Sequence, residues 1–189
     1  ASHALVRQSA LQALRDDIKL EQNQKILIHG GAGGIGSIAI QIAKSMGAYV
    51  ITTVGSDDVE FAKELGADEV IDYKNDDFAT KVTNLDAVFD TAGVSESINK
   101  SFEIVKKGGV VAYMSGAPDL SLAEKYEVKA IDVSTNGDVE KLETIKKLTE
   151  EGKVRPIVDK VFDLDQAKEA FTYQEKNHPR GKVVLKVKD

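Results

Sequence analysis

Five glycines stand within the seven residues from position 30 to position 36. The spacing Gly31-x-Gly33-x-x-Gly36 fits the dinucleotide-binding pattern, and Gly30-x-x-Gly33-x-x-Gly36 fits a close variant of it. In such a turn one glycine permits a sharp bend, one lets the backbone approach a pyrophosphate, and one lets a helix pack closely on a strand. The predicted pyrophosphate-binding residues are Gly30, Gly31, Ala32, Gly33, Gly34, Ile35 and Gly36, with Gly34 and Ile35 as backbone N–H donors.

Glycine-rich turns are common, so this one takes its meaning from the stretches that flank it. Residues 25–29 are apolar and β-branched, which favours a strand. From Ile35 to Met46 apolar residues recur with the spacing of one helix face, and Gly47 follows as a stop. The start of this helix, with its free N–H groups and positive dipole end, suits an anion.

Further apolar runs predict strands over residues 49–54, 69–72, 87–90, 110–114 and 128–133. They alternate with helical stretches and are nearly continuous in apolar residues, which is typical of a parallel sheet covered on both faces. Six such strands predict an α/β fold with a doubly wound parallel Rossmann sheet in the order 3-2-1-4-5-6. Its ligand crevice is expected at the switch point, beyond the carboxyl ends of strands one and four.

Several helix boundaries follow from local signals. A helix is predicted over residues 2–20, with one apolar face formed by Leu5, Leu11, Leu14 and Ile18. Asp57 and Glu60 have the spacing of a capping box for the helix that follows. The helix after residue 93 is expected to end in Lys106 and Lys107 and to stop at Gly108. Residues 120–126 fit either a helix or an irregular turn.

The last part of the chain changes character. It predicts a strand over residues 157–162, a helix over 165–174 and a charged edge strand over 182–187. We therefore divide the chain into a dinucleotide-binding Rossmann domain, residues 1–152, and a short C-terminal αβ annex, residues 153–189.

Turns that follow the strands should meet at the carboxyl edge of the sheet. Those after strands four and five carry small residues, as expected for a backbone that approaches a ligand closely. The residues predicted to line the crevice there are Thr91, Ala92, Gly93, Met114, Ser115 and Gly116.

Composition narrows the classes of function. The chain has 189 residues with 42% hydrophobic and 30% charged, typical of a globular domain. A net charge of −6 argues against wrapping of nucleic acid or attachment to an anionic membrane. With no cysteine the chain has no disulfides or thiolate metal sites, which suits the cytoplasm. The longest apolar runs are strand-sized, so no membrane span is expected.

Several ordered motifs carry a family resemblance. Residues 27–44, 64–73, 89–93, 151–156 and 181–185 resemble the medium-chain dehydrogenase/reductase family. The most similar branch is that of quinone oxidoreductases and NADP-dependent alkenal or enone reductases. The resemblance runs over nearly the whole chain.

The resemblance implies a function for a larger protein. Family members begin with a GroES-like catalytic domain, which this chain lacks, so the chain resembles a cofactor-binding fragment. The parent would transfer hydride from the nicotinamide to a quinone or an α,β-unsaturated carbonyl bound between two domains, and the fragment alone would turn over poorly. The resemblance also implies a homodimer formed through strand six. No side chain of this chain is predicted to be catalytic.

The choice of nucleotide depends on the loop after strand two. An acidic residue there would bind the ribose 2′-hydroxyl and favour NAD, but the position is Gly55. The resemblance implies that Ser56 and Tyr73 contact the 2′-phosphate of NADP and that Val133 lies beside the nicotinamide. Two carboxylates close by, Asp57 and Asp58, would repel a phosphate dianion. NADP is the prediction and NAD the alternative.

The sequence does not favour zinc-dependent catalysis, proton transfer by a histidine, P-loop phosphate binding or the tyrosine–lysine chemistry of other reductases. Zinc-dependent relatives take a ligand from the segment that enters the first helix, where residues 4–7 offer none and only His3 is near, so no metal is predicted. His29 could move protons, but relatives carry a histidine there without a catalytic role. No lysine ends the glycine turn as in a P-loop, and no tyrosine has a lysine four residues later. A nucleotide-sensing module and a methyltransferase stay as alternatives.

Overall fold

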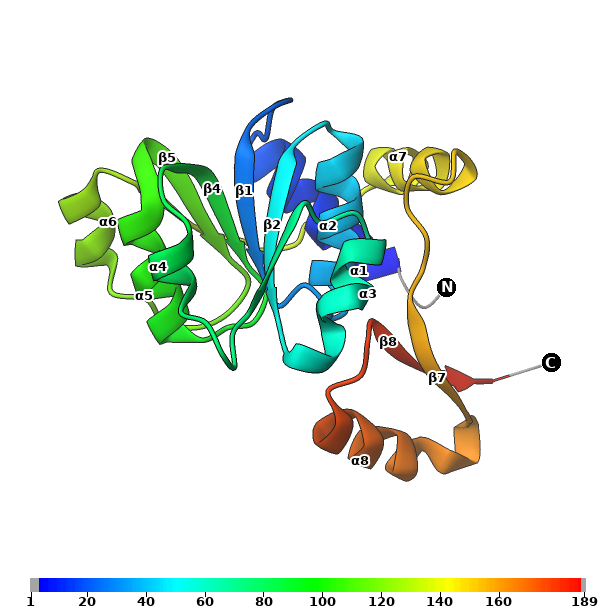
Figure 1. Ribbon diagram of the computed structural model, residues 1–189. Coiled ribbons are helices and arrows are strands. Elements are labelled where there is room, and N and C mark those ends of the chain that lie inside the picture. The colour runs from blue at the N-terminus through cyan, green and yellow to red at the C-terminus, as the bar shows by residue number, and fades with distance from the viewer. Residues whose placement is uncertain (1–3, 188–189) are drawn as a thin grey trace.

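A parallel six-stranded sheet forms the centre of the fold in the computed structural model, which describes residues 4–187 (Figure 1). Its strands are β1 (Lys25–His29), β2 (Tyr49–Val54), β3 (Glu69–Asp72), β4 (Leu85–Asp90), β5 (Val105–Tyr113) and β6 (Lys129–Asp132). Their order is β3-β2-β1-β4-β5-β6, so the predicted topology is confirmed. β1 lies between β2 and β4, with Ile28 level with Thr52 and Phe89.

Helices cover both faces of this sheet, as Figure 1 shows. They are α1 (Ala4–Gln12), α2 (Gly36–Ser45), α3 (Val59–Glu64), α4 (Phe78–Lys81), α5 (Ser95–Ile104), α6 (Leu120–Tyr126) and α7 (Val139–Glu150). Side chains of β1 alternate between the two cores: Ile26 and Ile28 join the cluster with α1, α2 and α7, and Leu27 joins the one with α4, α5 and α6. Burial on both faces explains why β1 is an unbroken apolar run.

The N-terminal helix differs from its prediction. After α1 the chain forms a π-helical segment, η1 (Ala13–Asp17), and Lys19 has a positive φ of 58°, so the helix ends before Leu20. Leu14 is fully buried, whereas Leu5 is 65% exposed and not part of the apolar face. At about 3.6 residues per turn, Leu5 cannot align with Leu11, because six residues are not a whole number of turns. The predicted start at Ser2 lies outside the described residues.

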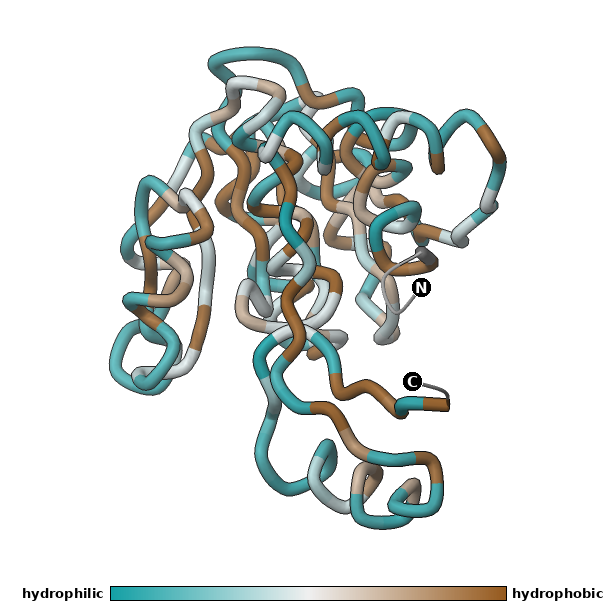
Figure 2. Tube along the Cα trace, turned by 90° about the vertical axis from the view of Figure 1, so that its right-hand side faces the viewer, coloured by the Kyte–Doolittle hydropathy of each residue, from teal (hydrophilic) through white to brown (hydrophobic). Residues whose placement is uncertain are grey.

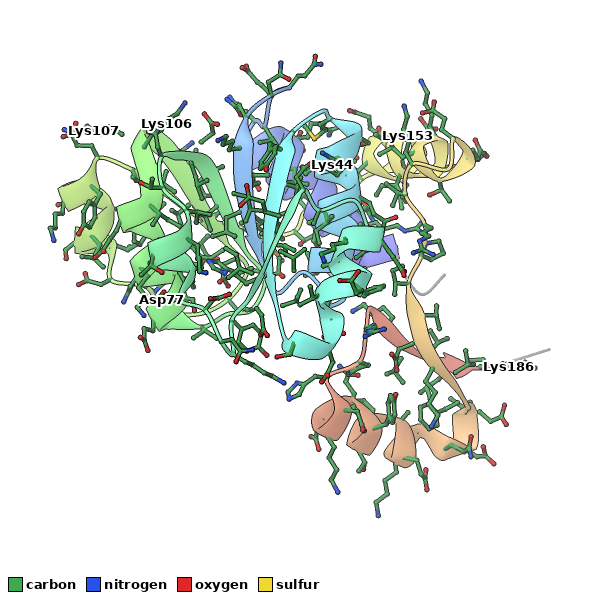
Figure 3. All side chains as sticks on the ribbon, in the orientation of Figure 1. Lys44, Asp77, Lys106, Lys107, Lys153 and Lys186 are labelled. Carbon is green, nitrogen blue, oxygen red and sulfur yellow. The ribbon has the colours of Figure 1, made fainter. Side chains whose placement is uncertain are left out.

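The expected helix end at Lys106 and Lys107 is wrong. Helix α5 ends at Ile104, and both lysines lie in β5, where Val105 pairs with Leu85 and the ammonium of Lys106 pairs with the carboxylate of Asp86. Figure 3 shows the two lysines at the end of the sheet opposite to Asp77. A cross-strand partner therefore extends the strand at the expense of the helix.

The predicted capping box at Asp57 is also wrong. Ser56–Asp58 form a 3₁₀ turn, η2, and Asp58 precedes α3 without a side-chain cap because its carboxylate binds Arg180. Residues 120–126, left open between helix and turn, form α6, capped by the side chain of Asp119.

The C-terminal segment forms a separate two-stranded parallel sheet. It consists of β7 (Val158–Asp163), the 3₁₀ turn η3 (Leu164–Gln166), α8 (Ala167–Asn177) and β8 (Lys182–Lys186). In Figure 1 it lies below α3, apart from the main sheet. Figure 2 shows apolar stretches along β7 and β8 as well as along the central strands. Exposed large apolar residues here are Val158, Val161, Leu164, Phe171 and Val187. The division at residues 152 and 153 stays a prediction.

Several hydrogen bonds hold this segment to the main body, among them those of Gln41 and Gly181. The amide side chain of Gln41 donates to the carbonyl oxygen of Arg155 at 3.2 Å and accepts from its N–H at 2.8 Å. The N–H of Gly181 donates to the carbonyl oxygen of Ala32 at 2.9 Å. The second bond places the C-terminal segment against the glycine turn. None of the helices within residues 4–187 has the length and apolar character needed to cross a lipid bilayer.

The contrast between Leu14 and Leu5 gives a stability test. Leu14→Ala is expected to lower the free energy of unfolding by about 2–5 kcal/mol, because it leaves a cavity at a fully buried site. Leu5→Ala, the matched control in the same helical segment, should change it by less than about 0.5 kcal/mol. Urea titrations of the two variants measure the difference, and equal losses would contradict the assignment of Leu5 to the exposed face.

Candidate functional site

A cleft of about 1120 Å³ opens at the carboxyl edge of the sheet. The main body lines it with residues of the glycine turn, the end of β2, residues 73–78 after β3, and the turn after β4. The C-terminal segment closes one side of it with residues 178, 179 and 181–183. The cleft therefore lies at the predicted switch point, but two parts of the chain form its walls.

The glycine turn has no room for side chains at two positions. A Cβ on Gly31 would lie 2.1 Å from Oγ1 of Thr52, and one on Gly36 would lie 2.2 Å from the carbonyl oxygen of Gly30. Gly30 itself has a φ of +76°, a conformation that glycine adopts without strain. These constraints bring the start of α2 directly onto the end of β1.

The turn also offers unused donors. The N–H groups of Gly34 and Ile35 donate to no backbone or side-chain acceptor within residues 4–187. They lie at the start of α2, where the helix dipole favours an anion. The side chain of Lys182 is adjacent, since a Cβ on Gly34 would lie 3.0 Å from its Nζ. This arrangement suits a diphosphate group.

The structure brings only part of the predicted set to the cleft. The predicted residues that line it are Gly30, Ala32, Gly33, Gly34, Tyr73, Thr91 and Ala92. Those outside its lining are Gly31, Ile35, Gly36, Ser56, Gly93, Met114, Ser115, Gly116 and Val133. Gly31 and Gly36 shape the turn from behind.

The turns after β4 and β5 contact each other. A Cβ on Gly93 would lie 2.3 Å from Oγ of Ser115, and one on Gly116 would lie 3.2 Å from the carbonyl oxygen of Gly93. The carboxylate of Asp90 accepts hydrogen bonds from the N–H groups of Gly93 and Ala92, and burial raises its pKa. Val133 is buried in the core and donates its N–H to Tyr113.

The loop after β2 contains the expected acidic residues, and basic residues from other parts of the chain, which were not predicted, lie beside it. The side chains of Tyr73 and Lys74 lie next to Gly55: a Cβ on Gly55 would be 3.6 Å from the Tyr73 hydroxyl and 3.7 Å from Nζ of Lys74. The hydroxyl of Ser56 donates to Asp72 at 2.6 Å, and this hydrogen bond lowers the pKa of Asp72. The position that carries a carboxylate in NAD-binding domains is thus covered by a phenol and an ammonium group.

Three basic residues were missed by the sequence analysis. Lys74 directly follows Tyr73, and Lys182 lies within the motif at residues 181–185, so both had a local signal. Arg180 binds Asp58 from 122 positions along the chain, and no spacing rule connects the two.

Hydrogen bonds hold the His29 side chain between β2 and α5. Its Nδ1 is 2.9 Å from Oγ1 of Thr53 on β2, and its Nε2 is 3.1 Å from Oγ of Ser101 on α5. The Ser101 hydroxyl donates to Ser97, so it accepts from Nε2, and Nδ1 then accepts from Thr53. Burial lowers the pKa of His29 to about 4, and the ring is neutral at pH 7. Both ring nitrogens are thus engaged in structural hydrogen bonds.

Within residues 4–187 no group of three His, Cys, Asp or Glu side chains is arranged to hold a metal ion. His3, the histidine near the zinc-ligand position of relatives, lies outside the described residues. The absence of a metal therefore stays a prediction.

The sheet order, together with a glycine turn at its switch point, defines a Rossmann-type domain. A model of the zinc-binding dehydrogenase family matches residues 65–185. The chain therefore belongs to that family, among the medium-chain dehydrogenases/reductases, as its motifs predicted.

Individual relatives agree with this assignment. The chain is 35% identical over 169 residues to the chloroplastic NADPH-dependent alkenal/one oxidoreductase of Arabidopsis thaliana, covering 86% of this chain and 40% of the relative. It is also similar to the solved quinone oxidoreductase from Coxiella burnetii, with a TM-score of 0.89, 33% identity, and coverage of 97% of this chain and 58% of the other.

A solved NAD-dependent alcohol dehydrogenase has the same TM-score of 0.89 at 29% identity, covering 97% of this chain and 57% of that one. The chain thus spans 40% to 58% of the length of these proteins.

The buried His29 predicts a pH dependence of stability. Its pKa is lower in the folded chain, about 4, than its ordinary 6.5, so the unfolded chain binds the proton first and stability is lost as the pH falls from 6.5 towards 4. Between about pH 7.5 and about pH 5 the loss from this residue should be roughly 2 kcal/mol. Urea unfolding of wild type and His29→Gln at both pH values measures it. A loss of the same size in the variant would refute the assignment.

Proposed function

We propose that the chain is the cofactor-binding part of an NADP(H)-dependent oxidoreductase. The parent would transfer hydride between the nicotinamide and a quinone or an α,β-unsaturated carbonyl. The observation that carries this proposal is the pair of polar groups over Gly55, the Tyr73 hydroxyl and the Lys74 ammonium, in a cleft that is also lined by Gly34 of the glycine turn.

The chain's own residues fit the two charged parts of such a cofactor. The N–H groups of Gly34 and Ile35 and the ammonium of Lys182 suit the diphosphate. Tyr73 and Lys74 suit a 2′-phosphate, because a phenol donates a hydrogen bond and an ammonium neutralises charge. The nicotinamide supplies the hydride chemistry, and the protein binds and orients it. The NADPH dependence of the Arabidopsis relative supports the same choice.

NAD(H) is the second candidate, favoured by a specific observation. Asp57 and Asp58 lie in the loop after β2, where carboxylates accept hydrogen bonds from an unphosphorylated ribose. The likeness to an NAD-dependent alcohol dehydrogenase points the same way. A nucleotide-sensing module without turnover is a third reading, and the methyltransferase alternative loses its basis because the family is established.

We propose that substrate binding and turnover take place in a longer protein that contains this chain. Since the chain spans 40% of the Arabidopsis relative, we propose that a GroES-like catalytic domain completes the site and that this chain alone turns over poorly. The exposed apolar residues of the C-terminal segment, among them Val161 and Phe171, support a missing partner surface. We also propose a cytoplasmic location, supported by the absence of cysteine.

Calorimetry tests the nucleotide proposal directly. We expect NADPH to bind the chain at least about tenfold more tightly than NADH. The Lys74 ammonium attracts the 2′-phosphate dianion of NADPH, whereas the 2′-hydroxyl of NADH has no charge to attract. Binding of NADH as tightly as NADPH would refute the choice of NADP.

A glycine variant tests the site. Gly33 lines the cleft, and apart from the residues adjacent in the chain, a Cβ there would have one described neighbour within 4 Å, the Gly30 carbonyl oxygen in close contact at 3.3 Å. Gly33→Val should therefore fold but lose at least about tenfold in affinity for both nucleotides, since its side chain occupies the cleft. Thermal unfolding confirms the fold. Undiminished binding would place the nucleotide elsewhere.

We further propose a homodimer through β6. This strand ends the six-stranded sheet, so one of its sides has unpaired backbone N–H and C=O groups, and pairing across a two-fold axis would satisfy them. Light scattering at several concentrations should show twice the mass of one chain. A monomer throughout would refute the dimer for this chain.

A further inference from the structure

Arg180 crosses from the C-terminal segment to the loop after β2. Its Nε donates to Oδ1 of Asp58 at 2.6 Å, and its Nη2 donates to the carbonyl oxygen of Asp57, also at 2.6 Å. The guanidinium lies over the ring of Phe61, 5.1 Å from its centroid. The Arg180 side chain thus contacts a carboxylate and a carbonyl group of the loop after β2 and an aromatic ring of α3.

The position of Arg180 is fixed from both sides. Its own N–H donates to Oδ1 of Asp159 on β7 at 3.2 Å, and the next residue, Gly181, donates to Ala32 in the glycine turn. These two hydrogen bonds fix the backbone at residues 180 and 181. The guanidinium is therefore held near Asp58 by the backbone position as well as by its own contacts. The pair is partly shielded, with the side chain of Asp58 22% exposed.

Arg180 changes the charge of the loop. A free carboxylate at Asp58 would repel a phosphate dianion and would suit a ribose hydroxyl instead. Paired with Arg180, this carboxylate is neutralised, and one of its two oxygens, Oδ1, accepts from the guanidinium. The ammonium of Lys74, in contrast, lies beside Gly55, and within residues 4–187 it makes no salt bridge, although its charge also acts on the nearby carboxylate of Asp72.

We propose that Arg180 determines the preference for NADP(H) over NAD(H) by neutralising Asp58, so that the C-terminal segment, and not the loop after β2 alone, sets the specificity. This inference rests on the proposed function. Arg180 is a positioning residue, since it acts through Asp58, and Lys74 is the residue that contacts the phosphate. The residues that flank Arg180, namely 178, 179 and 181–183, line the cleft. Docking of this segment onto the main body is therefore linked to recognition of the 2′-phosphate.

The test compares dissociation constants of NADPH and NADH for wild type and variants of the full chain by calorimetry. Arg180→Ala should weaken the binding of NADPH about fivefold and leave the binding of NADH unchanged or tighter. The freed carboxylate repels the 2′-phosphate, which NADH lacks, and solvent partly screens this repulsion. The double variant Arg180→Ala/Asp58→Asn should restore the NADPH affinity. Arg180→Lys should lie between wild type and alanine.

A matched control separates this effect from loss of one positive charge. Arg155→Ala removes an exposed arginine from the same C-terminal segment, whose bonds to Gln41 use backbone atoms, and should change neither affinity. Asp58→Asn alone keeps Arg180 and should tighten NADPH, so the inference remains testable if Arg180→Ala unfolds.

The outcomes are distinct. If wild type binds neither nucleotide, the proposed function fails and the inference fails with it. If wild type prefers NADPH but Arg180→Ala keeps that ratio, or weakens both nucleotides equally, the proposed function stands and the inference is overturned. The inference would also be overturned if Arg180→Ala/Asp58→Asn bound NADPH as weakly as Arg180→Ala alone. That result would indicate a purely structural role of Arg180, which does not depend on the Asp58 charge.

Discussion

The close approach of α2 to the end of β1 is the constraint on which the rest of the structure depends. A single Cβ on Gly36 would come within 2.2 Å of the Gly30 carbonyl oxygen, so any side chain there would force the helix away from the strand. The approach orients the start of α2 towards the cleft and leaves the N–H groups of Gly34 and Ile35 without acceptors among the described residues. Anion binding is the physical use of such an arrangement.

The same turn also holds the C-terminal segment, because Ala32 accepts the N–H of Gly181 and Lys182 lies over Gly34. Cofactor contacts and docking of this segment are therefore expected to support each other, since both use the turn. The cleft therefore has one wall in each part of the chain.

Much of the fold was predictable, because its signals are local. The strands are unbroken apolar runs such as residues 25–29, since a parallel sheet buries both faces, and the glycine stops follow from backbone conformation. Two of the errors occurred where a distant partner decides. Val105 begins β5 because Leu85 lies opposite, and Asp58 leaves its helix uncapped because Arg180 takes its carboxylate. Neither partner is adjacent in sequence.

The sequence by itself predicted the glycine turn and the sheet order, because periodicity and glycine spacing act over a few residues, and it indicated the family through the resemblance of several ordered motifs. It also indicated Tyr73 and the absence of an acid at Gly55. Only the tertiary structure decided which charges surround Gly55. Asp57 and Asp58 are visible in the sequence, whereas the pairing of Asp58 with Arg180 and the position of Lys74 beside Gly55 arise from the fold. Electrostatic energy depends on distance in space, and 122 positions of chain separate Arg180 from the acid that it neutralises.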